Sequence, residues 1–339
     1  MTAGPEAGDL GVPPLVRRER RAEERYAEQD REQREAERRF GPPCPGLTRR
    51  RFMLAMAALA VALTIAVAEM GLGLTPDRYL LVLLVPALVL GQPKKYVVDF
   101  VPFALLLIVY SACRGLAHIV HPSPFAQPQL SVEQFLFAGH LPTIELQHWL
   151  GTAHHSMSAR SAVIMTHLHF IVPPLLGFGL WIKRRSLFYR FAATMLVLSF
   201  AACVVFFVYP SAPPWAAAER HLTPPLVHVT RPSATASAGA SGVANAAVTR
   251  LIPKNPYAAV PSLHAGYAFV VFLFVAALGM GSRRRWWIVG AAFLYPLLQA
   301  TAVIYTADHY VVDALLGFAA AAGSYVAVNR LWRRLGLPD

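Results

Sequence analysis

The chain has 339 residues, of which 55% are hydrophobic and only 15% are charged, and its mean hydropathy is +0.43. A soluble domain carries about 25% charged residues, so this composition excludes an ordinary soluble globular protein. The formal net charge of +12 would also suit a nucleic-acid partner, but no groove-reading motif or aromatic-interleaved basic patch accompanies it. The composition predicts an integral membrane protein that does not bind nucleic acid.

The first 51 residues form a charged arm that precedes the apolar part of the chain. They hold 12 Arg and 10 acidic residues, and residues 17–40 have no apolar stripe. We expect a cytoplasmic arm that is disordered or partly helical. Contact with anionic membrane lipid is an alternative role, although acids and bases alternate evenly along it. The arm is not a signal peptide, because the first apolar segment begins only at Phe52.

Residues 52–334 predict a membrane domain. A membrane-spanning helix needs about 20 apolar residues. The candidate segments are 52–73, 79–91, 98–120, 162–182, 187–209, 262–281, 286–305 and 309–330. The second is short and is either tilted, re-entrant or not a span. The expected fold is all-α, a polytopic helical bundle of about eight membrane segments in which the last six form a core at about 98–330.

Basic clusters fix the expected orientation of this bundle. They lie between or beside the apolar segments at 49–51, 94–95, 183–185, 283–285 and 330–334. All five fall on one side if all eight segments cross the membrane, and cytoplasmic loops are the ones that retain Lys and Arg. We therefore expect both termini in the cytoplasm. If the short segment did not cross, the first basic cluster would lie on the opposite side of the membrane from the other four. This favours eight crossings, or a short segment that enters and leaves the membrane in a way that keeps the clusters on one side.

Two long loops are expected on the outer side. Residues 121–161 contain 131-SVEQFLFAGHLPTIELQHWLG-151, where apolar and polar residues alternate as in an amphipathic helix, or a pair of them, in the headgroup layer. Residues 210–261 include the Ala/Ser/Gly-rich tract 233–247. That composition predicts a flexible loop or lid.

Ionisable residues at membrane depth are costly and usually face a cavity or a partner. They are Glu69, Asp99, Arg114, His167, His169, His264, His309 and Asp313. Asp99 and Glu69 lie near segment ends and are explained by an interfacial position. The others collect toward the outer side, and they come from four different segments, which predicts a site there.

Two short motifs carry the chemistry of this site. In 309-HYVVD-313 the histidine and the aspartate share one helical face, so the carboxylate can hold a ring N–H and orient the imidazole. In 261-PSLH-264, Pro261 and Ser262 resemble a helix N-cap, where free backbone N–H groups favour an anion. Ser262, the amides that follow it and His264 would then form a phosphate cradle at the same outer depth as His309.

Each motif alone has an ordinary structural explanation. A serine cap beside a chance histidine is common, and an HxxxD pair is more often a structural hydrogen bond or part of a zinc site. Both motifs together, at the starts of two outward-facing segments, favour catalysis. Zinc is the rival, but neither HExxH nor CxxC is present, and Cys44, Cys113 and Cys203 are scattered. His154 and His155 lie in the outer loop and are read as interfacial.

PSLHAG at 261–266 and HYVVD at 309–313 resemble the second and third motifs of the type-2 phosphatidic acid phosphatase superfamily. Its members are integral-membrane enzymes that share a helical-bundle core with vanadium haloperoxidases. The stretches 99-DFVPFALLLIVYSACRG-115, 169-HFIVP-173, 209-YPSAPPW-215 and 256-PYAAVPSLH-264 resemble blocks of bacterial members, so the likeness covers roughly 75–330. It is greatest to the inositolphosphotransferase-like branch with the inositol phosphorylceramide and sphingomyelin synthases, whose last motif is also HYxxD.

The resemblance implies a role for each matching residue. His309 would attack phosphorus and form a phosphohistidine, and Asp313 would orient it. His264 would protonate the leaving oxygen and later deprotonate the acceptor. Ser262 and backbone amides, among them that of Gly266, would bind phosphoryl oxygens. Neither a metal nor a cofactor is required.

The chain also departs from the phosphatase pattern. The Lys-x6-Arg-Pro motif is missing, and the position six residues before the last histidine is Val303 rather than Arg. The positive charge must come from elsewhere, and Arg114 is the best candidate, with Lys254 or Arg250 behind it in the loop. Arg114 as a snorkelling interfacial residue is the alternative. His169 is either a further phosphate contact or a satisfied buried histidine.

These motifs predict an outward-facing lipid phosphotransferase in the cell membrane. It would move a phosphoryl group or phospho-headgroup from a lipid donor to an alcohol acceptor. The alternative is a phosphatase that uses water on phosphatidate or a polyprenyl phosphate or diphosphate, and the missing arginine motifs favour transfer. A non-catalytic membrane protein or transporter is the third possibility.

Overall fold

The computed structural model describes residues 24, 27–28, 30–32, 34–40, 44, 47–70, 76–120, 123–153, 156–230, 255–280 and 283–338. Within these ranges the chain is helical. The β structure there consists of two isolated bridges, which join Phe125 to Ser211 and Ser211 to Ala258. The expectation of an all-α fold is therefore confirmed.

The described helices follow the order of the expected segments. They are α2 (Arg49–Met70), α3 (Pro76–Val89), α4 (Pro93–Val120), α5 (Gln127–Leu136), α6 (Pro142–Leu150), α7 (Met157–Lys183), α8 (Arg185–Val208), α9 (Pro214–Glu219), α11 (Leu263–Gly279), α12 (Arg285–Tyr305) and α13 (Val311–Arg334). Each of the eight apolar segments expected from the sequence coincides with one of them. The predicted helices 98–120 and 162–182 begin earlier than expected, at Pro93 and Met157.

Length and composition make five of these helices, α4, α7, α8, α12 and α13, suitable for crossing a membrane. The apolar part of α3, Leu80–Val89, and α11 are shorter. A span of 17 residues such as α11 is at the lower limit of what a bilayer requires. The described helices thus form a multi-pass membrane protein.

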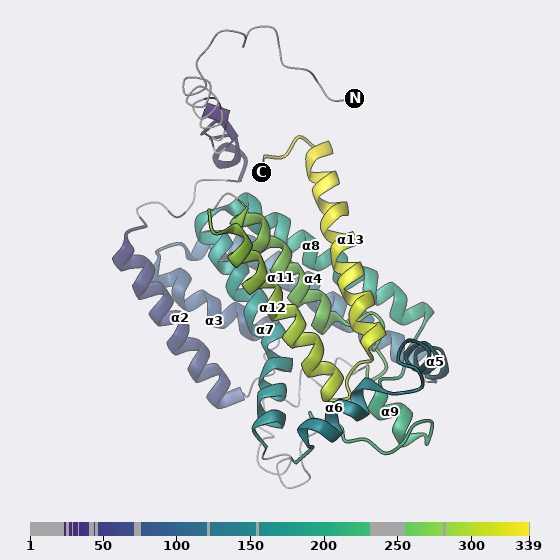
Figure 1. Ribbon diagram of the computed structural model, residues 1–339. Helices are drawn as coiled ribbons and strands as arrows, with labels where there is room; N and C mark the ends of the chain where they lie inside the picture. The colour runs from purple at the N-terminus through teal and green to yellow at the C-terminus, as the bar shows by residue number, and fades with distance from the viewer. Residues whose placement is uncertain are drawn as a thin grey trace.

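The long helices run side by side, and the molecule has two different ends (Figure 1). The C-terminus of α13 and the start of α2 lie at one end, which we call the basic end. The short helices α5, α6 and α9 lie at the opposite end, which we call the loop end. In the middle, α11 packs against α7, α8, α12 and α13, whereas α2 and α3 form a pair whose second member packs on α4.

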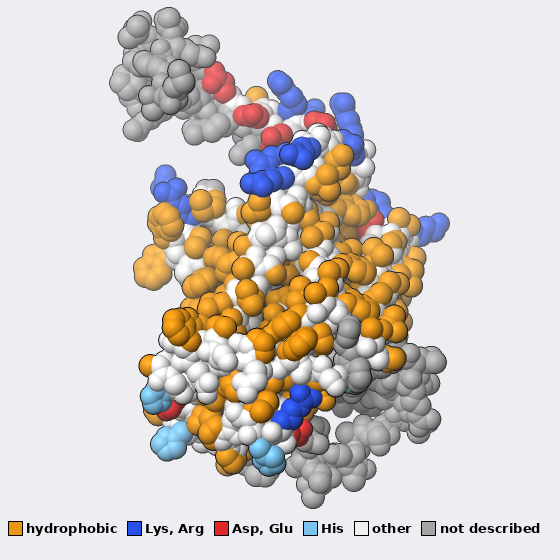
Figure 2. All heavy atoms as spheres, turned by 90° about the vertical axis from the view of Figure 1, so that its right-hand side faces the viewer, with side chains coloured by type: hydrophobic (Ala, Val, Ile, Leu, Met, Phe, Trp, Pro, Cys, Tyr) orange, Lys and Arg blue, Asp and Glu red, His pale blue; other side chains and the backbone are white. Residues whose placement is uncertain are grey.

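The distribution of apolar and charged side chains on the surface agrees with the division into a basic end and a loop end. Figure 2 shows a broad apolar belt, with Lys and Arg side chains gathered mainly above it and histidines below it. Many large apolar side chains of the helices are exposed, among them Leu81, Val98 and Leu105. A belt of this kind is what lipid-facing helices require, because lipid tails do not penalise exposed apolar surface.

A buried carboxylate ties three helices together near the basic end. Asp99 on α4 accepts hydrogen bonds from the Trp181 indole (2.6 Å) and the Tyr189 hydroxyl (2.5 Å), and it forms an ion pair with Arg185. Its side chain is fully buried. A charge in such a position is tolerated only when it is paired and hydrogen-bonded. Asp99 is therefore a structural anchor between α4, α7 and α8 rather than a merely interfacial residue.

The loop end contains the two segments expected outside the bundle. Residues 121–161 include α5 and α6, which confirms the pair of short helices, and these pack on α13 and α12 respectively. Residues 210–230 contain α9 and an extended stretch. The expected flexible tract 233–247, the loop residues Arg250 and Lys254, and the histidines at 154 and 155 lie outside the described residues.

Candidate active site

The N-terminus of α11 positions the first catalytic candidate. Ser262 is the N-cap, and its hydroxyl accepts a hydrogen bond from the Ala265 N–H (3.4 Å), as the sequence predicted for this serine. The Ser262 N–H in turn donates to the Asp313 carbonyl oxygen (3.0 Å). The start of α11, with His264 in its first turn, is therefore fixed to the start of α13.

His264 and His309 are in direct contact. The His264 Nδ1 atom lies 3.0 Å from the His309 Nε2 atom, and the His309 Nδ1 atom lies 3.0 Å from the Ala259 carbonyl oxygen. A carbonyl can only accept, so Nδ1 of His309 carries the hydrogen and Nε2 of the neutral ring has the lone pair. The bonding network consequently assigns the proton between the two rings to His264.

Asp313 contributes charge rather than the expected hydrogen bond. Its Oδ2 atom lies 3.6 Å from His309 Nδ1, which is too long for a hydrogen bond, and accepts one from the Tyr310 N–H (2.8 Å). The Oδ1 atom is buried without a partner among the described residues. The ring N–H of His309 is therefore held by the Ala259 carbonyl, while the Asp313 carboxylate lies beside the ring.

The Ala259 carbonyl is positioned by a segment that is distant in sequence. The hydroxyl of the buried Ser211 accepts a hydrogen bond from the Val260 N–H (2.7 Å), and the Ser211 N–H donates to the Tyr257 carbonyl (3.0 Å). Residues 209–215 were singled out in the sequence as a block, but neither Ser211 nor the Ala259 carbonyl was predicted. A contact made by main-chain groups does not depend on the residue type, so a sequence does not reveal it. The sequence analysis therefore identified the block 209–215 but not its hydrogen bonds to residues 257–260.

Glu133 on α5 is a second residue that the sequence analysis missed. Its side chain is fully buried, and its two oxygens accept from the N–H groups of Val311 (3.0 Å) and Val312 (3.3 Å), the first residues of α13. Burial raises the pKa of the Glu133 carboxyl and nearby Asp313 adds to this, whereas the two backbone hydrogen bonds oppose it. The carboxylate thus caps the helix that carries Asp313. Glu133 is one of two acids in the amphipathic stretch 131–151, and nothing in the sequence distinguishes it from Glu145.

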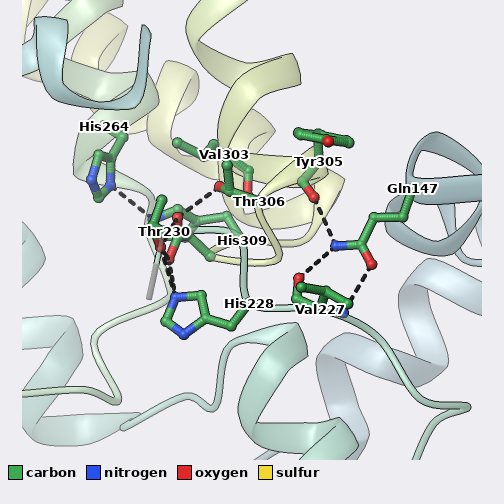
Figure 3. A network of polar contacts seen from close by, with 10 residues as sticks. Gln147, Val227, His228, Thr230, His264, Val303, Tyr305, Thr306 and His309 are labelled. Carbon is green, nitrogen blue, oxygen red and sulfur yellow. Dashed lines mark hydrogen bonds and ion pairs between the residues drawn. The ribbon is translucent and has the colours of Figure 1, made fainter. Parts of the chain in front are cut away.

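Side chains and backbone groups of the loop end hold the turn between α12 and α13 in place (Figure 3). The Gln147 amide donates to the carbonyls of Val227 (2.7 Å) and Tyr305 (2.9 Å) and accepts from the Val227 N–H (2.9 Å). His228 Nε2 lies 2.9 Å from Asp308 Oδ1. Residues 227–230 are thereby held against the turn that leads into His309.

Further contacts support the same turn. The Trp215 ring stacks on the His228 ring at a centroid distance of 5.0 Å, and its backbone N–H donates to the Ala307 carbonyl (3.2 Å). The Thr230 hydroxyl lies 3.2 Å from both oxygens of Asp308. Trp215 therefore helps to shape the site.

The histidine pair lies at one end of a cavity of about 350 Å³. His169 also lines this cavity, with its ring centroid 4.1 Å from that of His264 and its Nδ1 2.5 Å from the Thr166 carbonyl. Arg114 is the one permanently charged side chain among the described lining residues. Its guanidinium donates to the Asn255 carbonyl (3.2 Å). The structure thus brings Arg114 and His169 together with the pair.

Ser262 and Gly266 do not lie on the wall of this cavity. Ser262 is completely buried, and the Gly266 N–H donates to the Ser262 carbonyl (2.9 Å) within α11. A Cβ at Gly266 would lie 3.1 Å from a methyl carbon of Leu198 and 3.3 Å from the Gly317 carbonyl oxygen. The glycine therefore allows α11 to approach α8 and α13 closely.

Comparisons with known proteins agree with this architecture. The family model described as the PAP2 superfamily matches residues 130–327, which is more than half of the chain. The phosphoinositol dihydroceramide synthase of Bacteroides thetaiotaomicron is 32% identical over 158 residues, which cover 44% of this chain and 48% of that protein. The chain thus matches about half the length of this curated relative, and no solved structure matches it. On the family match, the chain belongs to the PAP2 superfamily of membrane phosphatases and phosphotransferases.

Proposed function

We propose that the protein is a lipid phosphotransferase that works through a phosphohistidine on His309. The contact between His264 Nδ1 and His309 Nε2, 3.0 Å long and located in a cavity with Arg114, carries this proposal. It places an unprotonated ring nitrogen beside a proton donor, which is the arrangement that nucleophilic catalysis with a general acid needs.

In the first step, the Nε2 lone pair of His309 attacks the donor's phosphorus and forms the P–N bond. The bond from phosphorus to the oxygen of the donor's glycerol breaks at the same centre. The hydrogen bond between His264 Nδ1 and His309 Nε2 opens when the donor binds. His264, acting as the imidazolium, then gives a ring proton to that oxygen, which leaves as an alcohol, and His264 becomes neutral. The positive charge that develops on the His309 ring is stabilised by the Asp313 carboxylate, 3.6 Å from Nδ1.

In the second step, His264 acts as the base. It removes the proton from the acceptor hydroxyl, whose oxygen attacks the phosphorus while the P–N bond breaks. His309 is then restored with its lone pair and His264 with its proton, so the cycle balances without any other reactant. Water in place of the alcohol would give hydrolysis by the same two steps.

Arg114 is assigned to the phosphoryl oxygens, because it supplies permanent positive charge in the cavity. His169 packs against His264 and is assigned a supporting contact. In phosphatases of the family the resemblance implies an arginine at the position of Val303, which here is fully buried in α12. The first amides of α11 add partial positive charge, and Ser262 acts through them as the cap.

The substrate class follows from the relative's name and is part of the proposal. A phosphoinositol dihydroceramide synthase attaches phosphoinositol to dihydroceramide. We assign to this chain the transfer of a phospho-headgroup, with phosphoinositol as the first candidate, from a glycerophospholipid to a ceramide-type alcohol. The site would face outward in the cell membrane, with both termini in the cytoplasm.

The test uses purified protein in detergent with phosphatidylinositol and dihydroceramide. We expect wild type to form phosphoinositol dihydroceramide and His309→Asn to lose on the order of a thousandfold or more of the rate. His140→Asn is the matched control, because His140 is an exposed histidine at the loop end, and it should retain the wild-type rate.

Two outcomes would contradict the proposal. A His309→Asn protein that turns over the lipid at the wild-type rate would show that His309 is not the nucleophile. Release of inositol phosphate without a phosphorylated ceramide product would support the phosphatase alternative instead of transfer.

A further inference from the structure

The cavity that begins at the histidines continues far along α4. The α4 residues that line it are Tyr96, Phe100, Phe103, Ala104, Leu107, Tyr110, Ser111 and Arg114. Their spacing of three and four places them on one continuous face of the helix. From Tyr96 to Arg114 this face measures about 27 Å at a rise of about 1.5 Å per residue. The cavity thus extends through most of the roughly 30 Å hydrocarbon core of a bilayer.

The lining chemistry changes in a fixed order along this length. Arg114 and the histidines form the polar end, and the hydroxyl-bearing Tyr110 and Tyr267 follow about one helical turn further in. The Tyr267 hydroxyl is hydrogen-bonded to Ser199 (2.7 Å). Beyond them the wall is almost entirely apolar. This order of charged, hydroxyl-bearing and apolar side chains complements the phosphate, the ester or amide linkage and the alkyl chain of a phospholipid or a phosphorylated ceramide.

The far end of the cavity is closed by packed aromatic rings. Tyr96 and Phe100 stack with ring centroids 4.6 Å apart, and Phe100 packs on Phe188 at 4.7 Å. The Tyr96 hydroxyl donates to the Leu80 carbonyl on α3 (2.9 Å). Packed aromatic rings therefore form the end of the cavity far from the histidines, and we call this cavity the tunnel and these rings its floor.

One side of the tunnel is bordered by α4 and α7, which both pack on α8 rather than closely on each other. Phe170 on α7 lines the tunnel and is 38% exposed, and Leu107 on α4 is half-buried. Leu80 and Leu83 of α3 cover the part nearer the basic end. An apolar space of this kind does not hold ordered water, and the partly exposed Phe170 is the lining residue through which it comes nearest to the lipid-facing surface of α7.

We propose that one alkyl chain of the lipid substrate lies in this tunnel along α4, so that the aromatic floor limits the chain length the enzyme accepts. The linkage that joins chain and headgroup then lies at the hydroxyls of Tyr110 and Tyr267. The headgroup chemistry rests on the proposed function, whereas the position of the chain rests on the cavity alone.

Photo-crosslinking of the wild-type protein tests chain position without any need for turnover. The probe is a phosphatidylinositol with a diazirine at the middle of one chain, in mixed micelles. Labelled peptides should carry the probe on tunnel-facing positions of α4, Phe103 and Leu107. Label confined to Leu105, Leu106 and Val109, which face outward and are exposed, would overturn the proposal.

A substitution in the middle of the tunnel tests the length limit. Ala104 is buried on the tunnel wall, ten residues or about 15 Å from Arg114. Ala104→Trp should lower the ratio of kcat/KM for N-stearoyl over N-octanoyl dihydroceramide about tenfold or more, because the indole blocks only the longer chain. Ala104→Leu is the milder variant, with a smaller change in the same direction.

Ala112→Trp is the matched control, because Ala112 lies on the same helix, is exposed and does not line the tunnel. It should leave the ratio within about twofold of wild type. An unchanged ratio in active Ala104→Trp and Ala104→Leu proteins would refute the length limit. If wild type turned over neither ceramide, the proposed function would fail, and the crosslinking result would still decide the position of the chain.

Discussion

The two nitrogen atoms of His309 have different partners, and this difference determines what each neighbour contributes. The Ala259 carbonyl fixes the tautomer through Nδ1, and His264 lies at Nε2. Asp313 acts on the His309 ring only through its negative charge, because its Oδ2 atom lies 3.6 Å from Nδ1, too far for a hydrogen bond. In the Ser-His-Asp triad the aspartate both fixes the tautomer and stabilises the imidazolium. Here these two tasks belong to different groups.

Asp313→Asn should therefore cost less activity than His309→Asn. The asparagine oxygen can still accept from the Tyr310 N–H, and the Ala259 carbonyl keeps the tautomer, so only the negative charge is lost. We expect a decrease in kcat of about a hundredfold, measured with the phosphatidylinositol and dihydroceramide assay. A decrease as large as that of His309→Asn would mean that the carboxylate also holds the proton on Nδ1.

Glu133 makes the stability of the folded protein depend on pH. The pKa of its carboxyl is raised in the folded protein, so the folded state binds a proton more readily than the unfolded state does. Its contribution to stability is therefore most favourable below its unfolded pKa of about 4.3 and becomes less favourable as pH rises through the folded pKa.

The measurement is the Tm of wild type and Glu133→Gln in detergent between pH 7 and pH 5. Glutamine cannot titrate, so the difference in Tm, wild type minus variant, should increase as the pH falls. A difference that stays constant or decreases would show that burial does not dominate the Glu133 environment. Exposed Glu35→Gln serves as the control and should show no such trend.

At the scale of elements, the approach of α13 to the start of α11 depends on a glycine. A Cβ on Gly317 would lie far inside van der Waals contact with the Ser262 carbonyl oxygen, which is backbone and cannot rotate away. Ser262 is the residue that caps α11, and its N–H donates a hydrogen bond to the Asp313 carbonyl oxygen. Gly317 thus sets the spacing between the helix that carries His264 and the helix that follows His309.

Gly317→Ala should consequently separate the two histidines. We expect loss of most activity together with a lower Tm, because the backbones of both helices must shift. Gly323→Ala on the same helix is the control, since a Cβ there meets nothing within 4 Å, and it should keep full activity. Wild-type activity in Gly317→Ala would show that the site tolerates this shift.

The elements themselves were well predicted from sequence, for a physical reason. Backbone groups in a bilayer must be satisfied within their own segment, so long apolar runs become helices whatever surrounds them. The ends were predicted less well. Met157 rather than residue 162 begins α7, because Ser156 caps it through the Ala159 N–H (3.2 Å) while the residues between are only moderately apolar.

The candidate site was predicted only in part. His264, His309 and Asp313 belong to short motifs at the starts of α11 and α13, and local spacing is visible in a sequence. The expected shared helical face of His309 and Asp313 was wrong, because His309 precedes the N-cap of α13, Tyr310. The Ala259 carbonyl, Ser211 and Glu133 act through backbone groups of residues far away in the chain. Such contacts depend on how helices and loops pack, which periodicity does not specify.

At the scale of the whole molecule, the two ends differ in charge and in construction. The buried Asp99 joins α4, α7 and α8 near the basic end, whereas hydrogen bonds from loops surround the histidines at the loop end. The buried ion pair of Asp99 and the loop contacts around the histidines thus lie toward opposite ends of the bundle. The distribution of Lys and Arg predicts that the basic end is cytoplasmic.

Cysteine labelling of intact cells can measure this orientation. In a background without the three native cysteines, His140→Cys at the loop end should react with a membrane-impermeant maleimide. Arg334→Cys at the basic end should react only after the membrane is permeabilised. Both positions are exposed in the structure, so the reverse pattern would mean that the enzyme faces the cytoplasm.

The order of Asp308 and His309 has a consequence for protein engineering. The Asp308 side chain is hydrogen-bonded to His228, which lies in residues 210–230, and the His309 side chain contacts His264 on α11. A single peptide unit therefore joins the contacts of residues 210–230 to His309, the proposed nucleophile. An exchange of residues 210–230 with those of a relative should therefore include Gln147 and Asp308. A graft made without them should change the orientation of the His309 ring as well.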